Sequence, residues 1–182
     1  MNPYLDQARE LLSRFYGYRD FRPAQVPVIE SLLAGHDALA IMPTGAGKSI
    51  CFQIPALIFP GLTLVISPLI SLMKDQVDAL AEQGIPATYI NSSLSLAESD
   101  ARLSAIAQGR YKLVYVAPER LSTSYFQYII DKQTISMVAV DEAHCISQWG
   151  YDFRPSYLRI AELREKLPGV PVLALTASAT KL

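Results

Sequence analysis

Short apolar runs alternate along this chain with longer stretches in which apolar residues recur at every third or fourth position. The short runs predict strands at residues 38–41, 62–66, 87–90, 112–116, 136–140 and 170–175. The longer stretches predict helices at residues 3–16, 23–33, 50–59, 69–83, 95–109, 125–131 and 156–166. Strands and helices therefore alternate about six times along the chain.

The predicted strands are apolar throughout instead of alternating between apolar and polar residues. This composition is typical of parallel strands that are buried on both faces. With the alternation of strands and helices, it predicts an α/β fold: a parallel sheet with right-handed crossovers and helices on both faces. In such a sheet ligands bind beyond the carboxyl ends of the strands, so we expect function in the loops that follow the predicted strands.

Turn and cap residues mark the ends of several predicted elements. Gly35 is expected to close the second helix in a left-handed conformation. Ser95 and Glu98 have the spacing of a capping box and predict the start of the helix that ends at Gly109. Pro118 is expected to open a loop or a short helix.

The first loop after a predicted strand reads Met-Pro-Thr-Gly-Ala-Gly-Lys-Ser, at residues 42–49. Glycines let the backbone aim several N–H groups at one point, and the helix that follows adds the positive end of its dipole. Lys48 is expected to reach the β- and γ-phosphates of a nucleotide, and the Ser49 hydroxyl to hold Mg²⁺. Although Met42 replaces the first glycine of the general pattern, the segment predicts a phosphate site formed by Thr44, Gly45, Ala46, Gly47, Lys48 and Ser49.

Two carboxylates, Asp141 and Glu142, follow directly after the predicted strand at 136–140. After a phosphate loop, such a pair is typical of the second half of a nucleotide–Mg²⁺ site. Asp141 is expected to bind the ion through water, and Glu142 to act on the attacking water as general base. The alternative is that both residues cap the following turn. His144 is either a structural residue or a link between this site and the part of the protein that moves.

The loop that follows, residues 145–155, contains the only tryptophan of the chain, Trp149, together with Tyr151, Phe153 and Arg154. Aromatic rings beside a guanidinium offer stacking and phosphate contacts to single-stranded nucleic acid. The alternative is that the aromatic residues fill the core beneath a loop.

Composition narrows the classes of protein to which these motifs can belong. The length of 182 residues suits one domain, and 51% hydrophobic residues provide a sizeable core. No apolar run approaches the ~20 residues of a membrane span, and there is no secretory signal pattern. Cys51 and Cys145 lie far apart, which argues against zinc or a disulfide scaffold and fits a reducing compartment. The net charge of −1 gives no support for nucleic-acid binding, although one groove can still be positive.

Taken together, the motifs resemble the RecQ family of DNA helicases, within the larger DEAD/DEAH-like helicase superfamily, over nearly the whole chain. The resemblance rests on Tyr-Gly-Tyr-Arg-Asp-Phe-Arg-Pro-Ala-Gln at 16–25, on the helicase form of the phosphate loop, and on Asp-Glu-Ala-His-Cys-Ile-Ser-Gln-Trp-Gly at 141–150. This last motif, followed by Asp-Phe-Arg-Pro, is the most specific, because Asp-Glu-Ala-His alone occurs in many RNA helicases. The chain departs from the family at Tyr16, where Phe is frequent, at Tyr151, where His is frequent, and at Ser178, where Thr is usual.

The resemblance implies a role for each matching residue. It implies that Tyr18 stacks on adenine, Gln25 hydrogen-bonds its edge and Arg22 helps to position the nucleotide, where the residues alone suggest ordinary packing. It implies that Lys48, Asp141, Glu142 and His144 are catalytic, and that residues 175–180 link the movements of two lobes. It also implies nucleic-acid contacts by Ser67, Pro68, Lys74, Gln76, Pro118, Glu119, Arg120, Trp149, Phe153 and Arg154.

The function implied by this resemblance is that of an ATP-dependent DNA helicase acting in DNA repair and recombination. Residues 1–182 would form a single RecA-like, P-loop NTPase lobe, the N-terminal motor lobe of a longer protein whose second lobe supplies an arginine to the transferring phosphate. ATP and Mg²⁺ would be the cofactors, single-stranded and partially duplex DNA the partners, and movement would be 3′-to-5′. We expect no membrane association, and a nucleoid-associated cytoplasmic location in a bacterium or a nuclear one in a eukaryote.

The residues leave two other functions open. One is an RNA-remodelling ATPase of the wider superfamily, and the other is a nucleotide-dependent binding module that does not hydrolyse ATP. For the lobe by itself, we expect weak nucleotide binding and little hydrolysis, because the second lobe's arginine is missing.

Overall fold

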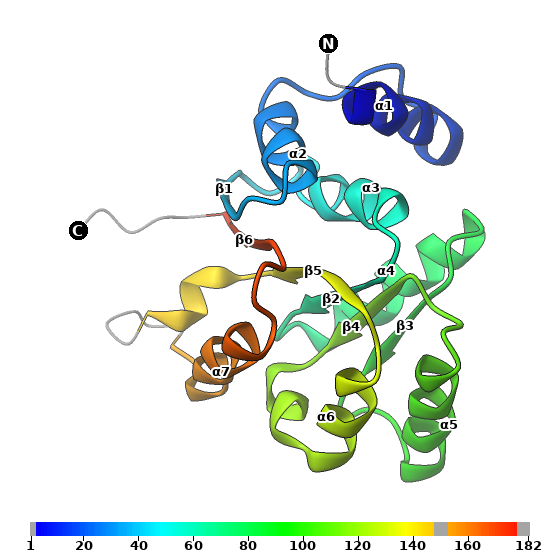
Figure 1. The fold of residues 1–182 in the computed structure, drawn as a ribbon, viewed down its shortest axis with the longest axis vertical. Helices are drawn as coiled ribbons and strands as arrows, with labels where there is room; N and C mark the ends of the chain where they lie inside the picture. The colour runs from blue at the N-terminus through cyan, green and yellow to red at the C-terminus, as the bar shows by residue number, and fades with distance from the viewer. Residues whose placement is uncertain (1–2, 148–152, 178–182) are drawn as a thin grey trace.

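The structure, a computed structural model, describes residues 3–147 and 153–177. Within these residues the chain forms a six-stranded sheet in the order β1-β6-β5-β2-β4-β3, and every neighbouring pair is parallel (Figure 1). The strands are β1 (Ala38–Ile41), β2 (Leu62–Ile66), β3 (Ala87–Ile90), β4 (Leu113–Val116), β5 (Ile135–Val140) and β6 (Val172–Thr176). The helices are α1 (Pro3–Tyr16), α2 (Gln25–Leu33), α3 (Ile50–Ile58), α4 (Ile70–Glu82), α5 (Leu96–Ala107), α6 (Ser124–Asp131) and α7 (Arg159–Lys166).

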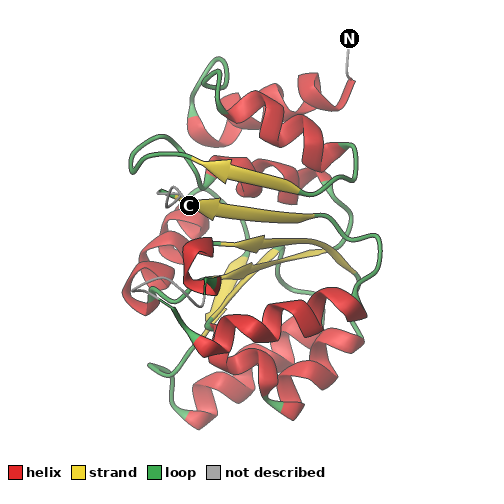
Figure 2. Ribbon diagram, turned by 90° about the vertical axis from the view of Figure 1, so that its left-hand side faces the viewer, coloured by secondary structure: helices red, strands yellow, loops and turns green. Residues whose placement is uncertain are grey.

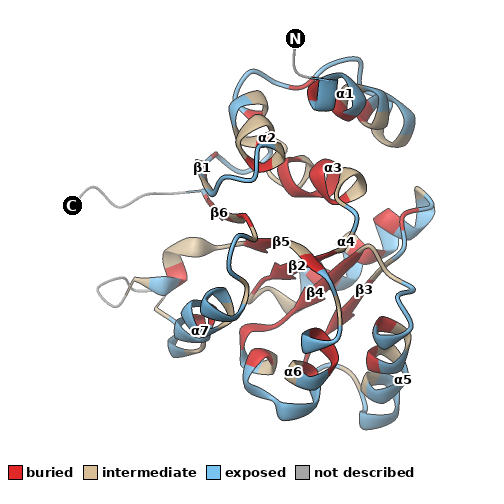
Figure 3. Ribbon diagram, viewed as in Figure 1, coloured by how far each residue is buried: buried red, intermediate tan, exposed pale blue. Residues whose placement is uncertain are grey.

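Helices cover both faces of the sheet, as the apolar strands predict. On one face, Val65 and Tyr115 pack against α2, α3 and α4, and on the other face Leu64 and Val116 pack against α5, α6 and α7. Figure 3 shows the central strands β2 and β4 as buried and the outer sides of the helices as exposed. The edge strand β1 differs from the prediction of burial on both faces, because Leu39 and Ile41 are more than half exposed. The predicted α/β fold with helices on both faces is therefore confirmed.

Helix α1 forms an additional outer layer. It packs on α2 and α3 and lies beyond them when seen from the sheet (Figure 1). Its contacts come from a separate apolar cluster of Leu5, Ala8, Leu12, Phe21, Ile29 and Ile54. The chain between α1 and α2 is the segment that the sequence assigns to adenine recognition.

The predicted elements are all present, and the predicted caps are confirmed. Gly35 has a φ of +82°, and Ser95 and Glu98 form a reciprocal capping box at the start of α5. The last strand begins at Val172 instead of residue 170 because Pro171 has no N–H to donate to the ladder, whereas the Val172 N–H donates to Asp37 Oδ1 (2.9 Å).

Within the described residues, three short 3₁₀ helices lie in the two connections that follow β4 and β5. They are η1 (Pro118–Ser122), η2 (Ala143–Ile146) and η3 (Pro155–Leu158). The helix predicted at 156–166 is thus divided into η3 and α7. No helix in the described part of the chain is long and apolar enough to cross a membrane.

The carboxyl ends of the strands lie along one edge of the sheet. Figure 2 shows all strand arrows pointing the same way, toward this edge. The register agrees, because Ile41 pairs with Thr176, and Ile66 pairs with both Val140 and Val116. The phosphate loop after β1, the carboxylates after β5 and the loops after β2, β3 and β4 therefore share this edge.

Candidate functional site

The phosphate loop depends on two glycines in the left-handed region. Gly45 has a φ of +82° and Gly47 a φ of +80°, conformations that other residues adopt only with strain. A Cβ added at residue 47 would lie 2.4 Å from Gln25 Nε2, whereas a Cβ at residue 45 would meet no atom within 4 Å. The dihedral angle therefore favours glycine at residue 47, and a Cβ there would also displace the end of the Gln25 side chain.

The N–H groups of this loop remain available to a ligand. In the described part of the chain, the backbone N–H groups of Gly45, Gly47, Lys48 and Ser49 donate no hydrogen bond to the protein. The loop is anchored at its start, where the buried Met42 donates its N–H to Thr176 O (3.0 Å). A fixed loop with unpaired donors beside a helix N-terminus is an anion-binding site.

Residues of the 16–25 segment hold this loop from one side. Arg22 Nη1 donates to Gly45 O (2.6 Å), and Gln25 Nε2 donates to Gly47 O (3.0 Å). Gln25 is 3% exposed, and its Oε1 accepts the Arg22 backbone N–H (2.8 Å). Tyr18, in contrast, is 56% exposed.

These two segments enclose a cavity of about 390 Å³, which we call the phosphate-loop cavity. Its volume is in the range of small-molecule sites. It is lined by Leu12, Tyr18, Asp20, Arg22, Gln25, Thr44, Gly45, Gly47, Lys48, Ser49 and Ile50. The structure thus brings together every residue predicted to bind the nucleotide except Ala46. It adds Asp20, which lies within the 16–25 segment, Ile50, which follows the phosphate loop, and Leu12, which the sequence indicates only as an apolar position of the first helix.

Asp141 lies at the same edge, two strands away from the phosphate loop. Its backbone N–H donates to Ile66 O (2.8 Å), and its Oδ1 accepts the Glu142 N–H (2.9 Å). Burial raises the pKa of Asp141, and the charge of Glu142 raises it further, whereas the charges of Lys48 and His144 lower it. Lys48 and Asp141 both follow strands at this edge of the sheet, after β1 and β5 respectively.

Glu142 follows in a strained turn. Its φ is +52°, the single positive φ of a residue other than glycine in the described ranges. Such a conformation costs about 1–3 kcal/mol and is found mainly at functional sites. The turn makes Glu142 leave the strand in a different direction from Asp141, so the two carboxylates can serve different atoms of one ligand.

His144 connects the ends of two neighbouring strands. Its Nδ1 lies 3.4 Å from Glu142 Oε2, after β5, and 3.0 Å from Thr176 Oγ1, at the end of β6. Thr176 belongs to the segment 175–180, to which the family resemblance assigns the coupling of two lobes. These contacts agree with both interpretations of His144, and its role as a link stays a prediction.

Tyr157 is a site residue that the sequence did not indicate. Its hydroxyl donates to Asp141 O (2.9 Å) from beneath the carboxylate turn, and its side chain is fully buried. Burial also raises the pKa of Tyr157, so its hydroxyl remains a donor. The sequence shows only an aromatic residue in a predicted helix, which is normally a core position.

A second cavity, of about 460 Å³, lies at the other end of the same edge, where β2, β4 and β3 end. It is lined by Pro68, Ile70, Ser92, Ala117, Glu119, Arg120, Thr123 and Arg154. We call it the arginine cavity, because neither Arg120 nor Arg154 forms an ion pair with a carboxylate in the part of the chain that the structure describes. Four of the predicted nucleic-acid contacts, Pro68, Glu119, Arg120 and Arg154, meet here.

Several other predicted nucleic-acid contacts lie outside this lining. Ser67 is buried, and its Oγ accepts the N–H of Leu69 (3.2 Å), whereas Pro118 is buried at the start of η1. Lys74 is exposed on α4 and pairs with Asp78 (2.5 Å).

The remaining predicted contacts are divided between the described and undescribed parts of the chain. Phe153 is half-buried, and Gln76 has a buried Oε1 that accepts no hydrogen bond from the described residues. Trp149, Tyr151 and Ser178 lie outside the described residues. The roles of these residues remain predictions.

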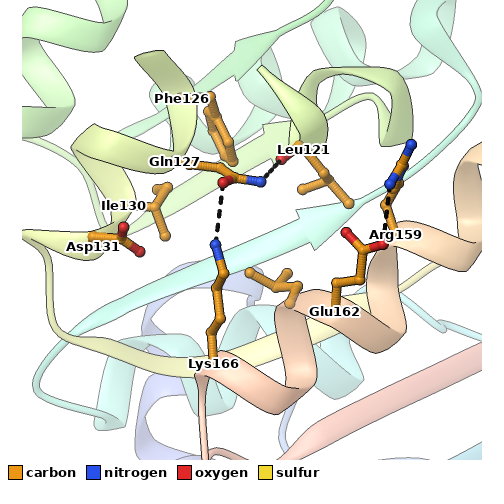
Figure 4. Close-up of a pocket in the computed structure, with 9 residues that line it drawn as sticks. Leu121, Phe126, Gln127, Ile130, Asp131, Arg159, Glu162 and Lys166 are labelled. Atoms are coloured by element: carbon orange, nitrogen blue, oxygen red, sulfur yellow. Dashed lines mark hydrogen bonds and ion pairs between the residues drawn. The ribbon is translucent and has the colours of Figure 1, made fainter. Parts of the chain in front are cut away.

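A third hollow, between α6 and α7, is too small to be a ligand site (Figure 4). Its volume is about 20 Å³, which is room for roughly one water molecule. Figure 4 shows one polar contact across it, in which Lys166 Nζ on α7 donates to Gln127 Oε1 on α6 (3.1 Å). A second contact, the ion pair between Arg159 and Glu162 (3.0 Å), lies within α7.

No cluster of three or more His, Cys, Asp or Glu side chains that could hold a metal occurs in the described part of the chain. A divalent ion beside Asp141 would therefore take most of its ligands from phosphate and water, which is how Mg²⁺ is usually bound in nucleotide sites.

Comparison with known proteins agrees with the geometry. ATP-dependent DNA helicase RecQ of Pasteurella multocida (strain Pm70) is 51% identical over 97% of this chain, and that of Bacillus subtilis (strain 168) is 54% identical over 97%. A protein of Acanthamoeba polyphaga mimivirus named as an ATP-dependent RNA helicase is 46% identical over 96%. The chain spans only 28%, 30% and 32% of the lengths of these relatives. These identities confirm the resemblance to RecQ helicases that was inferred from the motifs.

Solved structures confirm the fold at lower sequence identity. A hypothetical ATP-dependent RNA helicase from Sulfolobus tokodaii has a TM-score of 0.70 at 20% identity, covering 98% of this chain and 51% of that one. The DUF1998 helicase MrfA, bound to DNA and AMPPNP, has a TM-score of 0.76 at 17% identity, covering 100% of this chain and 27% of that one. The sequence profile of the DEAD/DEAH box helicases matches residues 22–182. This chain therefore belongs to the DEAD/DEAH box helicase family.

Proposed function

We propose that this chain is the ATP-binding motor lobe of a RecQ-type DNA helicase, which uses ATP hydrolysis to move 3′-to-5′ along one strand and unwind duplex DNA. The observation that carries the proposal is the placement of two cavities on one edge of the sheet. One has Lys48 and N–H groups that donate no hydrogen bond within the described residues. The other has two arginines that form no ion pair within those residues, and the Asp141–His144 turn lies between the two cavities. Its relatives named as RecQ helicases support the choice of DNA as substrate.

ATP and Mg²⁺ fit the residues of the phosphate-loop cavity. Its N–H groups and Lys48 match a triphosphate, and the Ser49 hydroxyl and Asp141 carboxylate are oxygen ligands of the kind that Mg²⁺ prefers. Bound ATP supplies the phosphoanhydride bond whose hydrolysis drives movement. Tyr18 is exposed on the lining of this cavity, where it can stack on the base.

The chain's own residues divide the chemistry among them. Lys48 offsets the negative charge of the phosphates, and Glu142 orients the attacking water and accepts its proton. The His144 contacts with Glu142 and Thr176 tie the water-orienting carboxylate to the end of β6. A change at this carboxylate can therefore move the segment that follows β6.

The arginine cavity is where we place the DNA strand. Two guanidinium groups that pair with no carboxylate of residues 3–147 and 153–177 are suited to phosphodiester groups, and such contacts bind without reading sequence. Arg154 follows closely on the Asp141–His144 turn, so DNA at this cavity can influence the hydrolysis site. This placement supports coupling between strand binding and ATP hydrolysis.

The motor requires a second lobe, which would supply an arginine to the transferring phosphate, a contribution worth ~10³–10⁵ in rate in other nucleotide hydrolases. We therefore expect residues 1–182 by themselves to bind nucleotide weakly and hydrolyse little. The test compares the rate of ATP hydrolysis by residues 1–182 with the rate by the full-length protein, both in the presence of single-stranded DNA. Equal turnover would show that the lobe needs no partner.

The experiment that tests the proposed substrate uses the full-length protein with matched single-stranded DNA and RNA. We expect DNA to stimulate ATP hydrolysis more strongly than RNA, and a duplex with a 3′ tail to be unwound faster than one with a 5′ tail. Stronger stimulation by RNA would support the second candidate, an RNA-remodelling ATPase, which the name of the mimivirus relative favours. An absence of hydrolysis under every condition would instead support a nucleotide-dependent binding module.

A further inference from the structure

The base-recognition segment is attached to a helix of the outer layer and not directly to the sheet. Helix α1 ends at Tyr16, and the chain turns at once at Gly17, whose φ is +73° and whose N–H donates to Ser13 O (3.0 Å). Tyr18 follows, exposed at the phosphate-loop cavity, and α1 also contributes Leu12 to the lining. The position of Tyr18 over the cavity therefore depends on how α1 is seated on α3.

Apolar contacts and a surface ion pair do not fix the position of α1 on α3 precisely. The cluster beneath α1 is apolar, and such contacts have no preferred direction. The ion pair between Arg9 and Asp20 (3.0 Å) is exposed, and pairs of this kind contribute little. A directional contact from the interior is needed to fix the end of the helix nearest to the base.

A chain of buried polar groups provides this contact. The Tyr16 hydroxyl donates to Gln53 Oε1 (2.5 Å), and Gln53 Nε2 donates to the Tyr115 hydroxyl (3.0 Å). Gln53 is 6% exposed and Tyr115 is 1% exposed. The chain runs from α1 through α3 to β4, so it connects the outer layer to the centre of the sheet. Burial raises the pKa of Tyr16, which keeps its hydroxyl a donor.

Gln53 is also close to the phosphate-binding half of the cavity. Its helix, α3, begins at Ile50 directly after Ser49, and the Gln53 N–H donates to Ser49 O (2.9 Å). The bond between Tyr16 and Gln53 therefore joins the segment that would hold the base to the helix that would hold the phosphates. A ligand that spans both halves needs them at a fixed separation, whereas a ligand that uses only one half does not.

We propose that Tyr16 is a positioning residue for the nucleotide base: its hydroxyl, bound to Gln53, sets the distance between the Tyr18 segment and the phosphate loop. This inference rests on nucleotide binding at the phosphate-loop cavity. Tyr16 does not touch the ligand. It acts by fixing the position of α1 on α3. Its loss weakens binding of ligands that carry a base and leaves binding of the phosphate chain unchanged.

The test compares ATP with inorganic tripolyphosphate, a probe without a base, both with Mg²⁺ and both measured by calorimetry on the full-length protein. In Tyr16→Phe we expect the affinity for ATP to fall about five-fold, as for one lost buried hydrogen bond, and the affinity for tripolyphosphate to stay within about two-fold. An equal fall for both ligands, or no fall for ATP, would overturn the inference. If the unsubstituted protein bound neither ligand, the proposed function itself would fail.

Two further variants separate positioning from general loosening of the core. Tyr115→Phe removes a buried hydroxyl from the same chain but keeps the bond between Tyr16 and Gln53, so we expect lower stability with an unchanged ratio of ATP to tripolyphosphate affinity. In a Gln53→Met background, adding Tyr16→Phe should weaken ATP binding no further, because the bond is already absent. A shift of the ratio in Tyr115→Phe as large as in Tyr16→Phe, or additive losses in the double variant, would contradict the positioning role.

Discussion

The phosphate-loop cavity and the arginine cavity lie on the same edge of one sheet, yet they are constructed differently. In the first, residues of the lining form hydrogen bonds with one another, Arg22 with Gly45 and Gln25 with Gly47. In the second, the side chains of Ser92, Arg120 and Arg154 form no hydrogen bond within the described part of the chain. A pre-organised cavity suits a small ligand that must be held in one geometry. An open one with free charges suits a polymer backbone that is gripped and released.

The largest expected effect is at the turn between the two cavities. Replacing Glu142 by Gln in the full-length protein removes the group that accepts the proton from water, so kcat for ATP should fall by about 10²–10⁴-fold while ATP affinity is kept. Glu162→Gln, at an exposed ion pair on α7, is the matched control and should leave kcat unchanged. A fall of less than about tenfold in Glu142→Gln would mean that this carboxylate is not the base that accepts the proton from water.

The next largest effect should separate the two cavities from each other. Arg154→Ala or Arg120→Ala removes one charged phosphate contact, which should lower the affinity for single-stranded DNA by roughly 10–100-fold and reduce the salt dependence by about 0.7 per contact. Affinity for ATP without DNA should not change. Arg110→Ala, an exposed arginine just after α5, serves as control. The measurement is fluorescence anisotropy of labelled DNA at several salt concentrations. An equal loss of DNA affinity in Arg110→Ala would show that the arginine cavity is not the DNA site.

A smaller effect tests how tightly the phosphate loop is fitted. Gly35→Ala and Gly47→Ala both place a side chain at a positive φ, near +80°, but only the Cβ at residue 47 meets a neighbour, Gln25 Nε2 at 2.4 Å. Gly35→Ala should cost about 1 kcal/mol of stability, and Gly47→Ala should cost more and also weaken ATP binding. Urea unfolding and nucleotide titration measure the two quantities. Equal behaviour of the two variants would show that Gln25 does not brace the loop.

The smallest effect concerns stability. Burial raises the pKa of Asp141, so the folded state binds a proton more tightly than the unfolded state. The stability of the protein should therefore fall as pH rises from the ordinary pKa of Asp through the raised value, and the cost persists above it. Asp141→Asn removes this cost and should raise the unfolding midpoint at neutral pH, by roughly 2–4 °C for each ~1 kcal/mol gained in a chain of this size. Thermal unfolding at neutral and acidic pH would show this, and a lower midpoint for the variant at neutral pH would contradict it.

The parts of the fold that could be predicted are those that local chemistry decides. Apolar runs marked the strands, Ser95 and Glu98 marked a helix start, and glycines marked the helix ends. The order of the strands could not be predicted in this way, because six short apolar strands are interchangeable as local sequences. The 3₁₀ helices after β4 and β5 could not be distinguished from loops, because their short local sequences are also interchangeable with those of loops.

The site shows the same division. Lys48, Ser49 and Asp141 could be identified because each follows a strand, and parallel strands bring their carboxyl ends to one edge. Contacts such as that of Arg22 with Gly45 could not, because they join residues that meet only in the folded chain. Tyr157 was hidden because its role comes from a single hydroxyl in an otherwise apolar position.

A crystal structure of the full-length protein with a non-hydrolysable ATP analogue, Mg²⁺ and a short single-stranded DNA tests the central claim most directly. The account predicts the triphosphate against Lys48 and the N–H groups of the phosphate loop, the metal between Ser49 and Asp141, and DNA phosphates on Arg120 and Arg154. A triphosphate bound away from Lys48, or a DNA strand crossing the opposite edge of the sheet, would contradict it.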